Sequence, residues 1–140
     1  MPIKPALIDT SVWLFALRKD FIPDIRSRVD DLLRNNLVFT TGIINLELLS
    51  GAKTDSEFQR LKDRLMTLDD IITDDIIWDK ASLLAFNLRR KGITVPHTDI
   101  LIAACAMSEG CVLLHADNHF DIIARHTDLV VESFVNIVRQ

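Results

Sequence analysis

The sequence lacks a long hydrophobic run and lacks cysteines spaced to bind a metal. Its longest uninterrupted apolar stretch, Ile100 to Met107, is 8 residues long, whereas a helix needs about 20 to span a bilayer. The N-terminal residues MPIKPALID contain no apolar segment of the signal-peptide kind, so we expect a cytoplasmic protein without membrane contact. Cys105 and Cys111 have neither CxxC nor cysteine–histidine spacing, which indicates reduced thiols that fill a core.

An excess of positive charge is also missing, and so are repeats, low-complexity segments and linkers. The formal net charge of −4 argues against a protein that coats nucleic acid non-specifically. It leaves open a nuclease whose acids bind cations and whose basic residues are local. With 49% hydrophobic and 26% charged residues, the composition is that of an ordinary globular protein. We therefore expect residues 1–140 to form a single domain.

Short apolar segments of strand length alternate with segments of helical periodicity along the whole chain. This alternation predicts an α/β fold, a parallel sheet with helices on both faces. Phe58 and Trp78 lie at inward positions of their helices, and Trp13 is predicted to lie in the core. The predicted strands cover residues 6–8, 37–40, 71–72, 111–114 and 129–131. The predicted helices start at residues 11, 23, 43, 55 or 56, 76, 98 and 118, and a short one lies at the C-terminus.

The stretch PALIDTSVWLFAL, residues 5–17, places an acid in an almost wholly apolar setting. Asp9 follows a predicted buried strand, and Ser11 is a good helix starter. A buried carboxylate is costly unless it is paired, hydrogen-bonded or bound to a cation. Ligands bind at such strand ends in open parallel sheets. Asp9 by itself is equally well explained as a turn cap or as a ligand.

Three further acids share this description. Glu47 is the only charge in IINLELLS, Asp99 precedes the run ILIAACAM, and Asp117 follows the apolar strand at residues 111–114. Two of them also have an ordinary explanation: an exposed stripe for Glu47, and a helix-dipole partner behind the N-cap Thr98 for Asp99. Coincidence across four separate elements is much less plausible, so these four carboxylates are predicted to form one acidic pocket.

An acidic pocket without cations would repel itself and raise its own pKa values. Divalent cations remove this problem, and oxygen ligands without a cysteine–histidine set favour Mg²⁺ or Mn²⁺ over zinc. Pairs of such ions activate water and stabilise the entering and leaving oxygens of a phosphodiester. The predicted chemistry is metal-dependent phosphodiester hydrolysis.

Four segments together resemble the successive motifs of PIN-domain ribonucleases, in particular the VapC-type toxins of bacterial toxin–antitoxin pairs. These segments are LIDTSVW, INLELLSGA, TDILIAACA and LLHADNHFDIIA, in the family's order. The resemblance implies a three-layer sandwich around a five-stranded parallel sheet, and an Mg²⁺-dependent endoribonuclease that hydrolyses RNA. It also implies a homodimer, silenced by a small antitoxin that lays a helix or strand over a groove of the toxin.

The resemblance also assigns residues. It makes Asp9, Glu47, Asp99 and Asp117 the catalytic, metal-binding acids, and it makes Thr10 or Ser11, together with Thr98, hydroxyl supports to them. One departure is visible, because many members carry a further acid where this chain has His119. We expect His119 to face solvent, with orienting water or contacting phosphate as alternatives; its presence puts a second metal position in question. Asp121 is expected to act through other residues, a full helical turn past Asp117.

Two other interpretations stay open at this stage. One is a PIN-like module that grips RNA or a protein without cutting, against which the four intact acids count. The other is a different acid-pocket protein such as a phosphatase or receiver domain, although these usually carry two adjacent acids where this chain has DTS. His97 and His115 flank the predicted site, and a hydrogen-bonded structural role is expected for each. Candidate RNA contacts are Arg18, Lys19, Arg89, Arg90 and Lys91.

Overall fold

The computed structural model describes residues 4–17 and 22–139. Its centre is one parallel sheet of five strands in the order β3-β2-β1-β4-β5. The strands are β1 (Ala6–Ile8), β2 (Val38–Thr41), β3 (Asp69–Ile71), β4 (Val112–His115) and β5 (Val131–Ser133). The predicted parallel α/β sheet is therefore confirmed.

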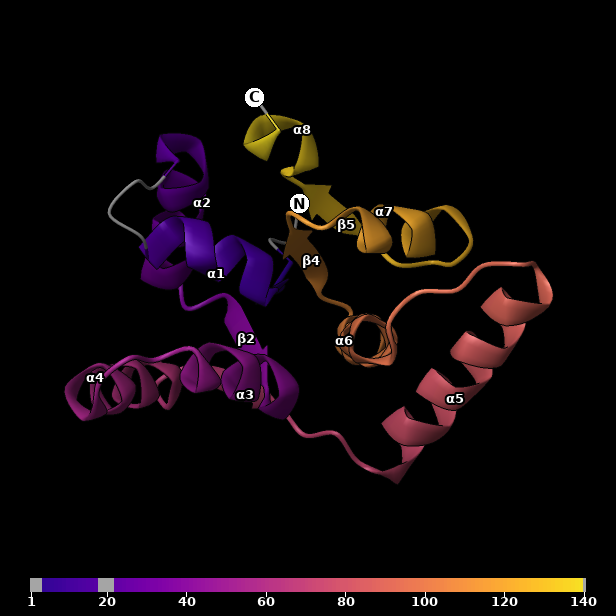
Figure 1. The fold of residues 1–140 in the computed structure, drawn as a ribbon, viewed down its shortest axis with the longest axis horizontal. Coiled ribbons are helices and arrows are strands. Elements are labelled where there is room, and N and C mark those ends of the chain that lie inside the picture. The colour runs from indigo at the N-terminus through magenta and orange to yellow at the C-terminus, as the bar shows by residue number, and fades with distance from the viewer. Residues whose placement is uncertain (1–3, 18–21, 140) are drawn as a thin grey trace.

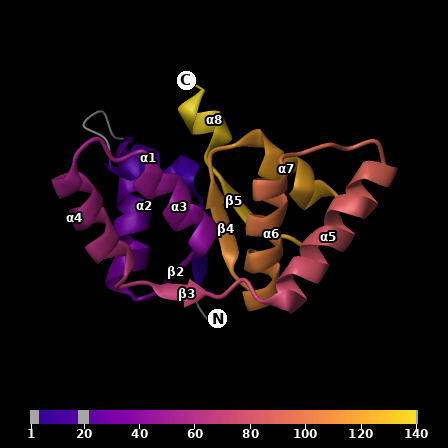
Figure 2. The same ribbon diagram turned by 60° about the horizontal axis from the view of Figure 1, so that its bottom comes forward.

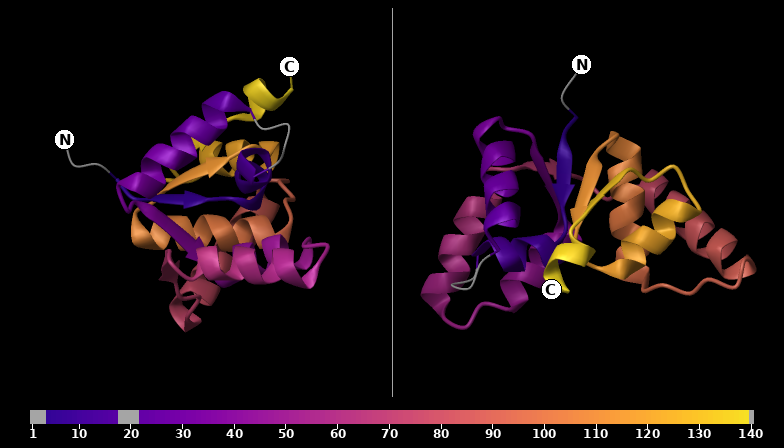
Figure 3. Two further views of the ribbon diagram at one scale, coloured as in Figure 1. Left: turned by 90° about the vertical axis from the view of Figure 1, so that its left-hand side faces the viewer. Right: turned by 90° about the horizontal axis from the view of Figure 1, so that it is seen from above.

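Helices cover both faces of this sheet (Figures 1 and 2). Figure 2 shows α1 to α4 on one side and α5 to α7 on the other, and Figure 3 gives the same layers from above. The helices are α1 (Thr10–Leu17), α2 (Pro23–Arg34), α3 (Gly42–Ser50), α4 (Asp55–Leu65), α5 (Asp75–Arg90), α6 (His97–Glu109), α7 (Asn118–Arg125) and α8 (Val135–Val138). The three-layer sandwich expected from the sequence is thus present.

The hydrophobic core lies where the central strands meet α6. Leu7, Ile8, Leu113 and Leu114 of β1 and β4 are fully buried, as strands covered on both faces must be. Every residue of α6 from 99 to 106 is buried, which explains why this helix carries no polar residue in its middle turns. Cys105 and Cys111 are buried free thiols, in agreement with their predicted role.

The ends of the helices follow local capping rules, with one exception to the predictions. The side chains of Thr41, Thr54 and Asp74 accept hydrogen bonds from backbone amides in the first turns of α3, α4 and α5. Gly110 ends α6 in the left-handed conformation, at φ 65°. The prediction of Thr98 as N-cap is wrong, because Pro96 holds that position and α6 starts at His97.

The sequence misplaced two strands and two aromatic side chains. β3 lies two residues earlier than predicted and β5 two residues later, both at an edge of the sheet. Edge strands carry a weaker apolar pattern because only part of their surface is buried. Phe58 and Trp78 were predicted to face the core but are 40% and 53% exposed. None of the helices within the described residues combines the length and apolar character needed to cross a membrane.

Candidate active site

The candidate site lies where the strand order reverses, between β1 and β4. β1 pairs with β2 on one side and β4 on the other, and the backbone amide of Asp9 donates to the carbonyl of Leu114 at 3.0 Å. Figure 2 shows that α1, α6 and α7 all begin at this end of the sheet. Such a switch point leaves a crevice at the carboxyl ends of the strands, the usual place for a ligand in open α/β sheets.

Asp9 is held at this crevice by Ser11. Its Oδ2 accepts hydrogen bonds from the Ser11 amide at 3.0 Å and from the Ser11 hydroxyl at 2.6 Å. The same hydroxyl accepts from the backbone amide of Ala116 at 2.9 Å, so Ser11 connects the ends of β1 and β4. Burial raises the pKa of Asp9, the bonds from Ser11 oppose that rise, and the charge of Asp117 adds to it.

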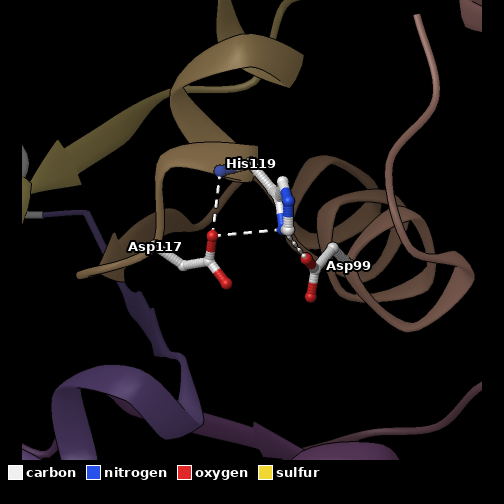
Figure 4. Close-up of side chains that lie close together, drawn as sticks. All are labelled: Asp99, Asp117 and His119. Carbon is white, nitrogen blue, oxygen red and sulfur yellow. Dashed lines mark hydrogen bonds and ion pairs between the residues drawn. The ribbon is translucent and has the colours of Figure 1, made fainter.

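Asp99, Asp117 and His119 form the tightest cluster of ligand-type side chains in the part of the chain that the structure describes. One ligand atom from each lies within 4.8 Å of the others. Nδ1 of His119 lies 3.0 Å from Oδ2 of Asp99 and 3.2 Å from Oδ1 of Asp117 (Figure 4). Asp99 comes from the first turn of α6 and is buried, whereas Asp117 is the N-cap of α7 and accepts from the His119 amide at 2.9 Å. The expectation that His119 simply faces solvent is therefore wrong, although its side chain is 42% exposed.

The carboxylates affect one another electrostatically. Burial raises the pKa of Asp99 to about 6, and the charges of Asp117 and Asp9 add to the rise, while His119 opposes it. Two like charges at close range disfavour ionisation of both. The site therefore holds more negative charge than its own hydrogen bonds compensate.

Glu47 approaches the same cluster from α3. It is half-buried, and its Oε1 accepts a hydrogen bond from the Thr10 hydroxyl at 3.0 Å. Burial raises the pKa of Glu47, the Thr10 bond lowers it, and the charge of Asp9 raises it further. Glu47 and Asp9 lie outside the three-residue cluster, yet Asp9 acts electrostatically on both Glu47 and Asp99. The four predicted acids thus gather in one region, with His119 among them.

His115 contacts the backbone of Asp117, and Asp121 lies against His115. His115 is completely buried against Phe120, with ring centroids 5.3 Å apart. Its Nδ1 accepts from the Asp117 amide at 3.3 Å, and its Nε2 lies 3.1 Å from Oδ1 of Asp121, outside hydrogen-bond alignment. Burial lowers the pKa of His115, so the neutral ring with its proton on Nε2 fits these partners. Asp121 also accepts from the Ser133 hydroxyl at 3.0 Å, so it contacts the site only through His115.

The remaining predicted residues lie at the margin of the site. Thr98 and His97 are exposed in the first turn of α6. Arg89, Arg90 and Lys91 are exposed at the C-terminal end of α5, which lies at the same end of the sheet as the site (Figure 2). Arg18 and Lys19 fall outside the described residues. The sequence did not reveal the contacts of His119 with Asp99, because they depend on how closely α6 and α7 approach.

This combination of fold and site defines an α/β protein with an acidic cluster at the switch point of a parallel sheet. The family model for the PIN domain matches residues 6–126. Ribonuclease VapC11 of Mycobacterium tuberculosis is 39% identical over 133 residues, which cover 91% of this chain and 98% of that protein. Ribonuclease VapC51 of the same organism is 35% identical over 125 residues, or 86% of each chain. The chain therefore belongs to the PIN-domain family and, within it, to the VapC ribonucleases.

A solved structure agrees with this assignment at the level of the fold. The chain is similar to one in the crystal structure of VapBC2 from Rickettsia felis bound to a DNA fragment from their promoter. The TM-score is 0.75 at 22% sequence identity, with coverage of 91% of this chain and 97% of that chain. Membership of the PIN-domain family removes the phosphatase and receiver-domain interpretations.

Proposed function

We propose that this chain is the toxin of a VapBC-type toxin–antitoxin pair, an endoribonuclease that hydrolyses RNA phosphodiester bonds with Mg²⁺, or with Mn²⁺ in its place. The observation that carries the proposal is the meeting of Asp9, Glu47, Asp99 and Asp117 from four separate elements at the β1/β4 crevice. The relatives named as ribonucleases support the same activity. Residues 1–140 would act as one PIN domain in the cytoplasm, where the protein would bind both RNA and the antitoxin.

The donor set fits a divalent cation. The site presents carboxylate oxygens, the ligands that Mg²⁺ and Mn²⁺ prefer. Burial, together with the negative charges of Asp117 and Asp9, raises the pKa of Asp99 to about 6. A cation bound by Asp9, Asp99 and Asp117, with Glu47 beside them, would relieve the repulsion among these charges. It would supply activated water and stabilise the charge that develops on the phosphodiester oxygens.

The chain's own residues position these acids. Ser11 fixes the carboxylate of Asp9, and Thr10 orients that of Glu47. His115 holds the backbone of Asp117 at the start of α7. The apolar strands behind the acids exclude water, which strengthens every electrostatic interaction at the site.

The test is cleavage of structured RNA by the purified protein with added Mg²⁺ or Mn²⁺, compared with chelator and with Asp9→Asn. Cleavage that depends on the cation and is lost in the variant supports the proposal. Activity that survives both treatments would refute the metal-nuclease mechanism. The alternative function, an RNA- or protein-binding module, gains support if the wild type binds RNA tightly and leaves it intact under all conditions.

The antitoxin is proposed to bind in a largely apolar groove in the helical layer formed by α1 to α4. A cavity of about 290 Å³ lies between α1, α2 and α4, and the exposed Leu17 forms part of its wall. Its walls include Trp13, Val29, Leu33, Leu61, Leu65 and Leu68. The VapBC2 structure is by its title a complex of toxin and antitoxin, which supports an antitoxin segment as the occupant. Leu61→Glu should weaken antitoxin capture, whereas Leu83→Glu on α5 should not.

A homodimer is proposed to form through α5. Trp78, Leu83 and Phe86 of this helix are 53%, 60% and 55% exposed, and Ile76 is 62% exposed. Several large exposed apolar side chains on one helix are a feature of interaction surfaces. A second copy of the chain is the partner that the family resemblance implies.

A further inference from the structure

His119 stands where many PIN-domain proteins carry an acid. It lies within the acidic cluster, and its Nδ1 faces Asp99 and Asp117. His119 follows Asp117 by two positions at the start of α7, and its backbone amide already donates to Oδ1 of Asp117. Its Nδ1 lies at 3.0 Å from Asp99 and 3.2 Å from Asp117 (Figure 4). The imidazole is thus held in a defined orientation by groups on both α6 and α7.

We propose that Nδ1 of His119 is a metal ligand, and that it makes this site select first-row transition ions such as Mn²⁺ over Mg²⁺. The inference rests on the proposed metal-dependent function and deepens it by assigning the ligand that sets the choice of ion. The geometric basis is the group of three ligand atoms, one from each of Asp99, Asp117 and His119, that lie within 4.8 Å of one another. Atoms so arranged can share one ion with only small side-chain adjustments.

The replacement of an acid by histidine explains why the site should prefer Mn²⁺ to Mg²⁺. Mg²⁺ is a hard ion that takes oxygen ligands and keeps several waters, whereas imidazole nitrogen suits transition ions. A histidine in place of an acid removes one negative charge, which weakens attraction for every divalent cation. Only the transition ions recover part of that loss through a bond to nitrogen. The Mn²⁺-over-Mg²⁺ preference should therefore be larger here than in a site built from acids alone.

Other histidines are poorly placed for this role. His115 is fully buried, and its two ring nitrogens face the Asp117 amide and the Asp121 carboxylate. His97 and His126 are exposed at the ends of α6 and α7. His126 provides a control, since it is an exposed histidine at the opposite end of α7 from His119, far from the three ligand atoms.

The experiment measures binding of Mn²⁺ and Mg²⁺ to protein stripped of metal, by electron paramagnetic resonance titration of Mn²⁺ and by competition with Mg²⁺. The wild type should prefer Mn²⁺, and His119→Asp should reduce the ratio of the two affinities by about 10-fold. Pulsed resonance spectra of the Mn²⁺-loaded wild type should show coupling to a ligand nitrogen. That coupling should disappear in His119→Asp and persist in His126→Ala.

The outcomes separate this inference from the proposed function. Mn²⁺ binding and metal-dependent RNA cleavage without nitrogen coupling would overturn the role of His119 and leave the nuclease proposal intact. Absence of any divalent-ion binding by the wild type would overturn both. Labelling the wild-type histidines with ¹⁵N must change the coupling if it arises from imidazole, so the result does not depend on the folding of a variant. A change in the KM for RNA alone, with spectra unaltered in His119→Asp, would assign His119 to substrate contact and refute the inference.

Discussion

Ser11 and Asp9 are joined twice, by a backbone amide at 3.0 Å and by a hydroxyl at 2.6 Å, both to the same carboxylate oxygen. Because the hydroxyl also accepts from the amide of Ala116, one small side chain fixes the carboxylate and connects two strand ends. The geometry of the candidate site therefore depends on Ser11 as well as on the acids.

Ser11→Ala should both destabilise the protein and impair the site. The substitution removes a hydrogen bond to Asp9 and leaves the partly buried Ala116 amide without its acceptor. We expect the free energy of unfolding to fall by about 1–3 kcal/mol, measured by urea denaturation, and RNA cleavage to fall with it. Ser82→Ala is the control, because the Ser82 hydroxyl donates to the Trp78 carbonyl on the exposed surface of α5. Equal losses in the two variants would contradict the role given to Ser11.

Asp99→Asn should stabilise the metal-free protein in a pH-dependent manner. The pKa of Asp99 is raised from 3.8 to about 6, so the folded state binds a proton more readily than the unfolded state does. The ionised carboxylate therefore costs stability above about pH 6, and that cost disappears as the pH falls from about 6 towards 4. We expect the variant to be more stable than the wild type by about 1–2 kcal/mol at pH 7, with a smaller difference at pH 4.5.

The measurement for this prediction is chemical denaturation of both proteins in chelator across that pH range. Asp79→Asn, which removes an exposed carboxylate of α5 outside the site, is the matched control. A wild type that exceeds Asp99→Asn in stability at pH 7 without metal would contradict the cost assigned to the buried, ionised Asp99.

Metal should reverse that order of stability. A cation that binds only the folded state adds about 2.7 kcal/mol when present at about 100 times its Kd. Mn²⁺ or Mg²⁺ should therefore raise the Tm of the wild type, chelator should restore it, and Asp99→Asn and Asp117→Asn should respond little. Differential scanning calorimetry measures the effect. An equal rise in Tm for wild type and Asp117→Asn would place the bound ion elsewhere.

Trp78→Glu should convert a homodimer into monomers. A charge introduced into an apolar interface remains unpaired and desolvated, which costs several kcal/mol, while on an exposed surface it costs little. Light scattering after size-exclusion chromatography over a range of protein concentrations measures the mass. Phe58→Glu is the matched control, since Phe58 is an exposed aromatic residue on α4, away from α5 (Figure 1). A monomeric wild type, or a dimer that survives Trp78→Glu, would contradict the proposed interface.

Local sequence patterns predicted the helices and strands that depend on neighbouring residues in the chain. They failed where the position of a side chain depends on contact with a second helix or another chain. The run after Asp99 predicted α6 because an apolar helix ended by glycine has few other conformations open to it. The strand ends at Asp9 and Asp117 followed from the change from apolar to polar residues. Trp78 was misjudged because periodicity identifies an apolar face and does not reveal whether the same chain covers it. His119 was misjudged because its partner Asp99 belongs to another helix.

The hydrogen bond between Ser11 and Ala116 spans 105 positions of the chain. During synthesis, β1 and its acid therefore leave the ribosome long before β4 exists to pair with them. The acidic cluster can assemble only after Asp117 and His119 have emerged, so a shorter nascent chain lacks it. The proposed ribonuclease activity would therefore begin only when synthesis of the chain is almost complete.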